Sequence, residues 1–172
     1  GYGRLQRQVM AVADADGAIA YYYEYHAGTD IVSKKIGYAN ADYSDPKNPN
    51  FTNIVFVYEY DLSGNLITNI TYYPSGRMES MILTTQDADN AIYYHYMDES
   101  FYDNSTPGDT SDDYGRVDKQ ILAGVDLDGA IAYEFTYHAG TDVIATKIGY
   151  SSGDYTDPSN PVLTGKVIEF VY

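Results

Sequence analysis

Six carboxylates fall between residues 98 and 113 with no basic side chain among them, so this segment is the part of the chain best suited to bind a metal ion. Carboxylate oxygens are the ligands that hard cations such as Ca²⁺ prefer. The cluster predicts a calcium site, and its alternative is a solvated loop without a ligand. Its members are Asp98, Glu99, Asp103, Asp109, Asp112 and Asp113.

Two other acidic motifs, Asp14-x-Asp16-Gly17 and Asp126-x-Asp128-Gly129, resemble part of a calcium-binding loop. A complete EF-hand loop also needs a ligand two residues earlier and a bidentate Glu six residues after the Gly. Those places hold Val12 and Tyr23 in the first motif, and Gly124 and Phe135 in the second. Because Asp-Gly suits tight turns, both motifs predict two-residue hairpin turns instead.

The histidines and the nucleophile-type residues show no catalytic spacing. His26, His95 and His138 fall at equivalent strand positions, and a metal site would require them to be close together. No Ser, His and Asp arrangement suggests a nucleophile, and Gly-rich phosphate loops are absent. The carboxylates of Glu24 and Glu134 simply recur with the sequence repeat. We therefore expect a protein that is not an enzyme, with a glycosidase as the weaker alternative.

Three N-x-S/T sequences, at Asn50, Asn69 and Asn104, are possible glycan acceptors. Alternation along the strand places Asn69 away from its apolar neighbours, and Asn104 lies in the acidic segment. If the protein is exported, these positions predict a glycoprotein.

Composition excludes several classes of protein. The 172 residues include no Cys, which excludes a disulfide scaffold and thiolate metal sites. The 10 basic and 25 acidic side chains give a net charge of −15, which disfavours nucleic-acid binding. No apolar run is long enough to span a membrane, and the opening Gly1 indicates a processed product or a fragment.

The chain repeats itself with a spacing of 112 residues, as the string DGAIAY shows at Asp16 and again at Asp128. Residues 1–60 align without gaps on residues 113–172, and roughly half of the aligned positions are identical. YHAGTD, KIGY and DYxDPxNP recur in the same register. We divide the chain into a first full repeat, 1–112, containing hairpins and the acidic loop 98–113, and a second half repeat, 113–172, homologous to 1–60.

A shorter pattern places an apolar or aromatic residue at every second position after each turn. This spacing of two is typical of one face of a β-strand. The rings are expected to form one apolar packing surface, the tyrosine ladder, while the opposite face is solvated or lines a wet lumen. The ladder consists of Ile19, Tyr21, Tyr23, Tyr25, Ile92, Tyr94, Tyr96, Ile131, Tyr133, Phe135 and Tyr137.

The predicted fold is all-β, an antiparallel meander of repeated hairpins in a spiral or tube-like sheet with essentially no helix. Pro-containing connections are expected at 39–50 and 151–161. The eleven expected strands lie near residues 2–13, 18–26, 30–38, 51–61, 65–73, 76–86, 91–97, 114–125, 130–138, 142–150 and 163–172.

Three motifs resemble the YD repeats of RHS proteins and teneurins. They are Tyr60-Asp61-Leu62-Ser63-Gly64-Asn65-Leu66, Tyr73-Pro74-Ser75-Gly76-Arg77-Met78 and Tyr114-Gly115-Arg116-Val117. The resemblance covers about half of the chain. It implies successive hairpins wound into a spiralling β-shell. The longer units and the lack of a toxin or protease region are departures from that family, so the resemblance supports the hairpin spiral and not toxin delivery.

Exposed strand edges at both ends lead to the functional hypothesis. Residues 2–13 and 167–172 read as regular strands without polar caps, and open edges pair with other strands. We expect a structural protomer of an extracellular or cell-surface filament or sheath, assembling head-to-tail into a helical homopolymer. The alternatives are a carbohydrate-binding or adhesin module that uses exposed Tyr, and a fragment of a long YD-repeat surface protein. Apart from Ca²⁺, no cofactor is expected, and the expected partners are further copies of the chain and glycans, but not nucleic acid.

Overall fold

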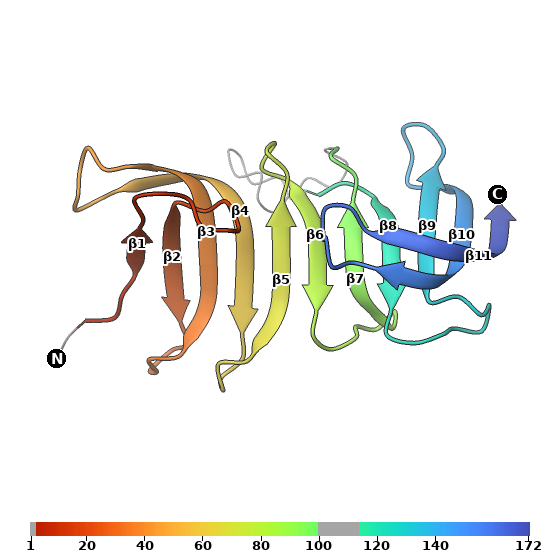
Figure 1. Ribbon diagram of the computed structural model, residues 1–172, viewed down its shortest axis with the longest axis horizontal. Coiled ribbons are helices and arrows are strands. Elements are labelled where there is room, and N and C mark those ends of the chain that lie inside the picture. The colour runs from red at the N-terminus through yellow and green to blue at the C-terminus, as the bar shows by residue number, and fades with distance from the viewer. Residues whose placement is uncertain (1–2, 100–113) are drawn as a thin grey trace. The chain divides into compact units, whose positions relative to one another are not determined.

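The computed structural model describes residues 3–99 and 114–172, which form eleven β-strands and no helix (Figure 1). The strand pairings of the described residues are antiparallel and join chain neighbours, so the predicted all-β meander is confirmed. The strands are β1 (Arg7–Val9), β2 (Ala20–Tyr25), β3 (Val32–Asp42), β4 (Asn50–Tyr60), β5 (Leu66–Tyr72), β6 (Met78–Leu83), β7 (Ala91–Tyr96), β8 (Val117–Leu122), β9 (Ala132–Tyr137), β10 (Ile144–Asp154) and β11 (Val162–Val171).

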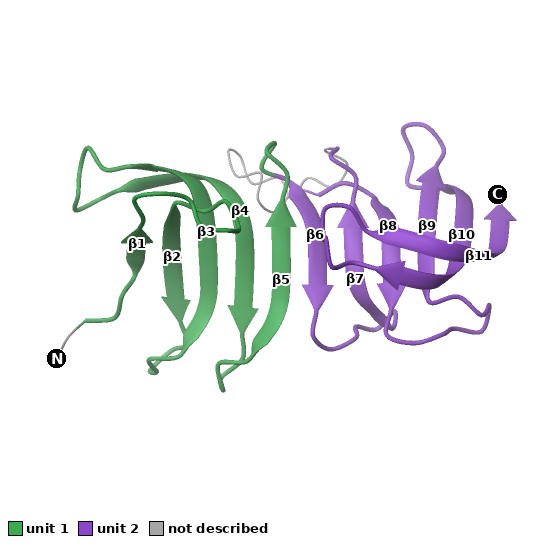
Figure 2. Ribbon diagram, in the orientation of Figure 1, with its two compact units in different colours: residues 1–76 green, residues 77–172 purple. Residues whose placement is uncertain are grey.

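The chain divides into two compact units, residues 1–76 with β1 to β5 and residues 77–172 with β6 to β11 (Figure 2). This division does not coincide with the repeat boundary at residue 112. The reason is that β7, from the first repeat, pairs along β8, which opens the second repeat. In the alignment of the repeats, β1 to β4 of unit 1 correspond to β8 to β11 of unit 2.

The strand limits differ from the predicted ones at two kinds of place. β1 has three residues where twelve were expected, because an edge strand is held from one side only. β3 and β10 run on to Asp42 and Asp154, inside the segments predicted as connections. The first prolines of the connections, Pro46 and Pro158, lie four residues beyond these strand ends and therefore leave room for the longer strands.

The Asp-Gly motifs form hairpin turns, but with three-residue loops where two-residue loops were predicted. In the first turn, Asp14 N donates to Ala18 O (2.9 Å) and Gly17 N donates to Asp14 O (3.1 Å). The fourth turn residue has positive φ, 82° at Gly17, which is a type I turn followed by a left-handed residue. The Asp14 carboxylate closes the turn by accepting from the amides of Asp16 and Ala18, both at 3.0 Å.

The same carboxylate turn recurs at Asp61, Asp87 and Asp126. The structure therefore uses the first Asp of each calcium-like motif as an acceptor for backbone amides. Asp87 also accepts from the Tyr94 hydroxyl at 2.5 Å. Burial opposes ionisation of Asp87, but the hydrogen bonds from Tyr94 and from backbone amides outweigh it and lower the pKa of this carboxyl.

The second face of the unit 2 sheet is buried around β7 and β8, which corrects the expectation of a solvated face or wet lumen for that part; on β9, Glu134 is partly buried and Thr136 is exposed. Tyr93 is 0% exposed and packs with Ile121 and Ala132. The long β10–β11 hairpin covers this face: Tyr155 stacks on Tyr93 with ring centroids 5.2 Å apart, and the Tyr93 hydroxyl donates to Pro158 O at 2.7 Å. Figure 1 shows this hairpin crossing β7 and β8. The second copy of the DYxDPxNP sequence, residues 154–161, thus forms the tip of a covering hairpin.

Candidate functional site: aromatic face and open strand edges

The aromatic face of unit 1 is built on β2, β3 and β4. Tyr21 and Phe56 are buried there, and Phe56 stacks on Tyr58 with centroids 4.4 Å apart. The Lys35 ammonium lies 4.1 Å from the centre of the Tyr21 ring and 5.3 Å from that of Phe56. Gly37 makes room for this packing, because a Cβ there would lie 2.6 Å from the Phe56 ring. The KIGY motif therefore supplies a cation and a gap for a ring.

Unit 2 repeats the arrangement with Lys147 over Tyr133 at 3.7 Å and over Phe170 at 5.9 Å. A cation above a ring stabilises the face by about 0.5–2 kcal/mol. The predicted ladder comprises only apolar and aromatic residues, and the prediction did not include these two lysines. The signal was present in the repetition of KIGY, whose Lys falls opposite the ladder rings in the next strand.

The ladder residues do not all share one packing cluster. Tyr94, Tyr96, Tyr133 and Phe135 pack together in unit 2, and Tyr21 and Tyr23 pack together in unit 1. Ile92 and Ile131 pack instead with Tyr93 and Ile121 on the second face. The bulge between Ala91 and Tyr93 shifts the register of β7 at Ile92, and Ile19 and Ile131 precede their strands. Tyr25 and Tyr137 each donate a hydroxyl to a backbone carbonyl, that of Leu5 and that of Val117, both at 2.6 Å.

The two described members of the acidic cluster bind arginines. Asp98 Oδ1 pairs with Arg77 Nη1 at 3.0 Å. Glu99 binds the Arg116 guanidinium with both oxygens, Oε1 to Nε at 2.6 Å and Oε2 to Nη2 at 2.9 Å. This fork lowers the pKa of Glu99, mainly through its side-chain hydrogen bond to Arg116. Asp103, Asp109, Asp112 and Asp113 lie outside the described residues.

Each histidine has its own local contacts. His26 Nε2 lies 2.9 Å from Tyr60 O, and the buried His95 holds Asp118 at 2.6 Å through Nδ1. His138 follows β9, and its backbone N–H donates to Val143 O at 3.0 Å. Over residues 3–99 and 114–172, no group of three or more His, Asp or Glu side chains has the arrangement of a metal site.

The three candidate glycan acceptors differ in exposure. Asn50 is exposed at the start of β4. Asn69 lies inside β5 opposite Tyr58, and its carboxamide oxygen is buried. Asn104 lies outside the described residues. Asn50 is therefore the described acceptor that best fits a glycan.

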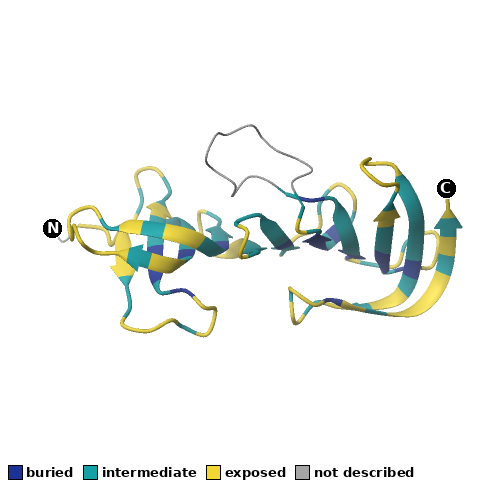
Figure 3. Ribbon diagram, turned by 90° about the horizontal axis from the view of Figure 1, so that it is seen from above, coloured by how far each residue is buried: buried dark blue, intermediate teal, exposed yellow. Residues whose placement is uncertain are grey.

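Two strand edges are open in one copy of the repeat and paired in the other. β8 pairs with β7 along Tyr93, Tyr94, His95 and Tyr96, whereas the described residues place no strand beside the outer edge of β1, the counterpart of β8. Likewise β4 pairs with β5, whereas the outer edge of β11, the counterpart of β4, has no described neighbour. Figure 3 shows β11, which ends at the C label, as largely exposed.

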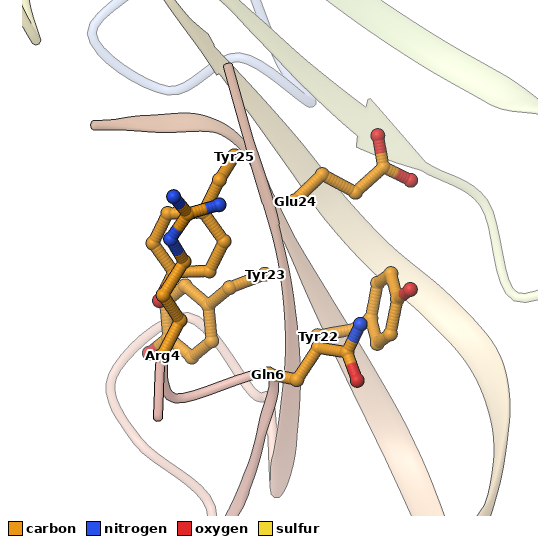
Figure 4. A pocket seen from close by; sticks show the side chains of 6 residues that line it. All are labelled: Arg4, Gln6, Tyr22, Tyr23, Glu24 and Tyr25. Atoms are coloured by element: carbon orange, nitrogen blue, oxygen red, sulfur yellow. The ribbon is translucent and has the colours of Figure 1, made fainter. Parts of the chain in front are cut away.

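A hollow of about 470 Å³ lies beside the open edge of unit 1. Figure 4 shows the Arg4 guanidinium against the ring of Tyr25, with Tyr23 beside it and Glu24 on the other side of the strand. The guanidinium carbon lies 5.4 Å from the centre of the Tyr25 ring, and Nε pairs with Asp30 at 2.7 Å. The remaining lining residues are Gln6 and Tyr22.

We expect alkaline pH to destabilise the protein through its partly buried tyrosines. Burial, followed by the nearby Asp16, raises the pKa of Tyr58 from 10 to about 12, and burial with a hydrogen bond to Glu134 raises that of Tyr150 to about 12. A pKa that is higher in the folded state than in the unfolded state means that folding favours the neutral hydroxyl. Each such hydroxyl therefore makes its full contribution to folding stability below pH 10 and loses it between pH 10 and 12. Urea unfolding followed by circular dichroism across this range measures the loss. The Y58F and Y150F variants should each show a smaller loss, and constant stability up to pH 12 would contradict the expectation.

No protein-family model, curated protein or solved structure matches this chain. In the part of the chain that the structure describes, no helix is long and apolar enough to cross a membrane.

Proposed function

We propose that the protein is a structural building block of an extracellular filament or surface sheath, extended by β-strand pairing at its open edges. One observation carries the proposal: among the described residues no strand lies beside the outer edges of β1 and β11, while their counterparts β8 and β4 each carry a paired strand. An edge with unpaired N–H and C=O groups is a template for another strand. The resemblance to YD repeats, in which hairpins follow one another in series, supports the same function.

The β11 edge has the exposure expected of a surface that another strand covers. Val171 is 75% and Tyr172 is 65% exposed, whereas their counterparts Glu59 and Tyr60, beside β5, are partly buried. Tyr172 N donates to Ala145 O at 2.9 Å. Because the ladder bonds of an antiparallel strand alternate in direction, the N–H of Val171 points away from β10 to the open edge.

The alternative of a sugar-binding module has less support from the rings of the hollow. The Tyr25 face is covered by Arg4 and its hydroxyl donates to Leu5 O at 2.6 Å. The Tyr23 hydroxyl donates to Gln8 Oε1 at 3.0 Å. Sugar binding needs free ring faces and free polar groups, and in this hollow one face of Tyr25 and the hydroxyls of Tyr23 and Tyr25 are engaged within the chain.

Concentration-dependent assembly tests the proposal. Sedimentation velocity and negative-stain electron microscopy should show elongated particles that grow with protein concentration. V171P removes the outward N–H without removing a ladder bond to β10, so it should reduce the assembled fraction by about tenfold with little change in the unfolding midpoint. V171A keeps the N–H and serves as the matched control. Monomers at all concentrations, or equal assembly of V171P and V171A, would contradict the proposal.

A further inference from the structure

In unit 2, the segment formed by β7 and the three residues after it is bound by Gly115, Arg116 and Tyr155. The Met97 N–H donates to Arg116 O at 3.0 Å. The Met97 carbonyl lies directly over Gly115, in the space that a side chain would occupy. Both carboxylate oxygens of Glu99 accept hydrogen bonds from the Arg116 guanidinium, and the Tyr93 ring is stacked on the ring of Tyr155. The segment is therefore held by its backbone, a carboxylate and a ring.

Unit 1 contains the same three binding groups at the corresponding positions, Gly3, Arg4 and Tyr43. A Cβ on Gly3 would meet no atom of the described residues within 4 Å. The Arg4 side chain is 44% exposed, against 12% for Arg116, and Tyr43 is 46% exposed where Tyr155 is partly buried. The hollow of about 470 Å³ borders this Arg4 side chain.

The contacts that position the arginine are also preserved. The Arg4 guanidinium lies over Tyr25 at 5.4 Å and that of Arg116 lies over Tyr137 at 4.7 Å. The difference is the carboxylate: Arg116 binds Glu99 with two oxygens, whereas Arg4 pairs with Asp30, whose side chain is 90% exposed. An exposed pair of this kind contributes little, so a better carboxylate can displace Asp30.

From this comparison we infer that the β1 edge is a binding site for an extended peptide segment that carries an aromatic residue and, six residues later, a glutamate, as Tyr93 and Glu99 do. The segment lies antiparallel to β1. Its backbone carbonyl occupies the space over Gly3, its glutamate binds Arg4, and its aromatic ring packs under Tyr43 from the β3–β4 hairpin. The inference goes beyond the proposed edge pairing, because no glutamate follows an aromatic residue by six positions in β11, and the segment described is therefore not the β11 strand of another copy.

The glycine has a specific purpose in this site. At Gly115 any side chain collides with the backbone carbonyl of the bound segment, while Gly3 has free space around it in the isolated chain. A side chain at position 3 therefore leaves the fold intact and blocks the incoming backbone. This separates binding from folding in one substitution.

A labelled synthetic peptide with the sequence of residues 91–99, added to the full chain, tests the inference by fluorescence anisotropy. Saturable binding is expected, weakened about tenfold or more by G3V and by R4Q in the protein, and by E99Q in the peptide. D30N should bind the peptide more tightly, because it frees Arg4 from its competitor. Unfolding midpoints of all variants control for folding.

The results separate this inference from the proposed function. Peptide binding that is insensitive to G3V, R4Q and E99Q overturns the inference, and so does the absence of binding while the protein still forms filaments. Peptide binding with the expected sensitivities in a protein that stays monomeric supports the inference and counts against the filament. Filaments that shorten when the peptide is added support both.

Discussion

The G115A variant is expected to lose about 3 kcal/mol of stability in unit 2, although the change adds only one methyl group. The new Cβ would collide with the carbonyl of Met97, and backbone atoms cannot move aside as a flexible side chain can. Relief requires β7 and its following residues to separate from β8, which strains the Met97–Arg116 hydrogen bond and the Glu99 fork. Overpacking of this kind costs about 1–3 kcal/mol, and the backbone location places it at the upper end.

Urea unfolding monitored by circular dichroism measures this loss, and G3A is the matched control. Gly3 occupies the same place in the repeat and has open space around it, so G3A should unfold within about 0.5 kcal/mol of the unchanged protein. Equal destabilisation by both substitutions would show that the glycine acts through backbone freedom and not through the close approach of Met97. Because the chain has two compact units, a separate early transition in G115A would assign the loss to unit 2.

The sequence was sufficient to predict the type and number of strands because both signals are local. Alternation with a period of two marks β2, β7 and β9, and a residue with positive φ marks most of the short turns, such as Gly17, Gly64 and Gly129. The three-residue loops were missed because the residue that closes the turn, Asp14, was considered only as a metal ligand. Its spacing from Gly17 also fits a carboxylate that accepts backbone amides.

The assignment of residues to faces required the structure. Alternation assumes an uninterrupted strand, and a bulge at Ile92 moves that side chain to the face of Tyr93. Burial of the second face depends on the β10–β11 hairpin folding back over β7 and β8, a contact between residues about sixty positions apart in sequence. No local pattern indicates which strand such a hairpin will cover.

The candidate site was present in the sequence as motifs without an assigned purpose. The Gly-Arg pair recurs at Gly3 and Gly115 with the 112-residue repeat, and the structure gives the second copy a purpose, because Glu99 and Met97 lie against it. The acidic cluster was assigned to calcium because no basic residue lies within it. Its partners Arg77 and Arg116 come from outside the segment, which a count of charges along the chain does not detect.

Truncating Tyr93 should produce the largest loss of stability, about 4 kcal/mol for Y93A, because it is the largest fully buried side chain of unit 2. The substitution leaves a cavity between Ile121 and Ala132, removes the stack on Tyr155 and leaves the Pro158 carbonyl without the Tyr93 hydroxyl. Y93F keeps the ring and removes only that hydrogen bond, so it should lose about 1 kcal/mol. The difference between the two variants measures the packing of the ring under the hairpin.

The hairpin side of this contact has an internal control, because Tyr43 and Tyr155 occupy the same place in the two copies of the repeat. Y155A should lose about 1–2 kcal/mol through the missing stack, whereas Y43A should change stability by less than about 0.5 kcal/mol, since Tyr43 is 46% exposed. With edge pairing, Y43A should lower the stability of the assembled form and leave the unfolding of dilute, monomeric protein unchanged. Equal losses of stability from Y43A and Y155A in dilute protein would mean that the tip of the β3–β4 hairpin stabilises unit 1 without covering a strand. The comparison of the two copies would then no longer support a partner at the β1 edge.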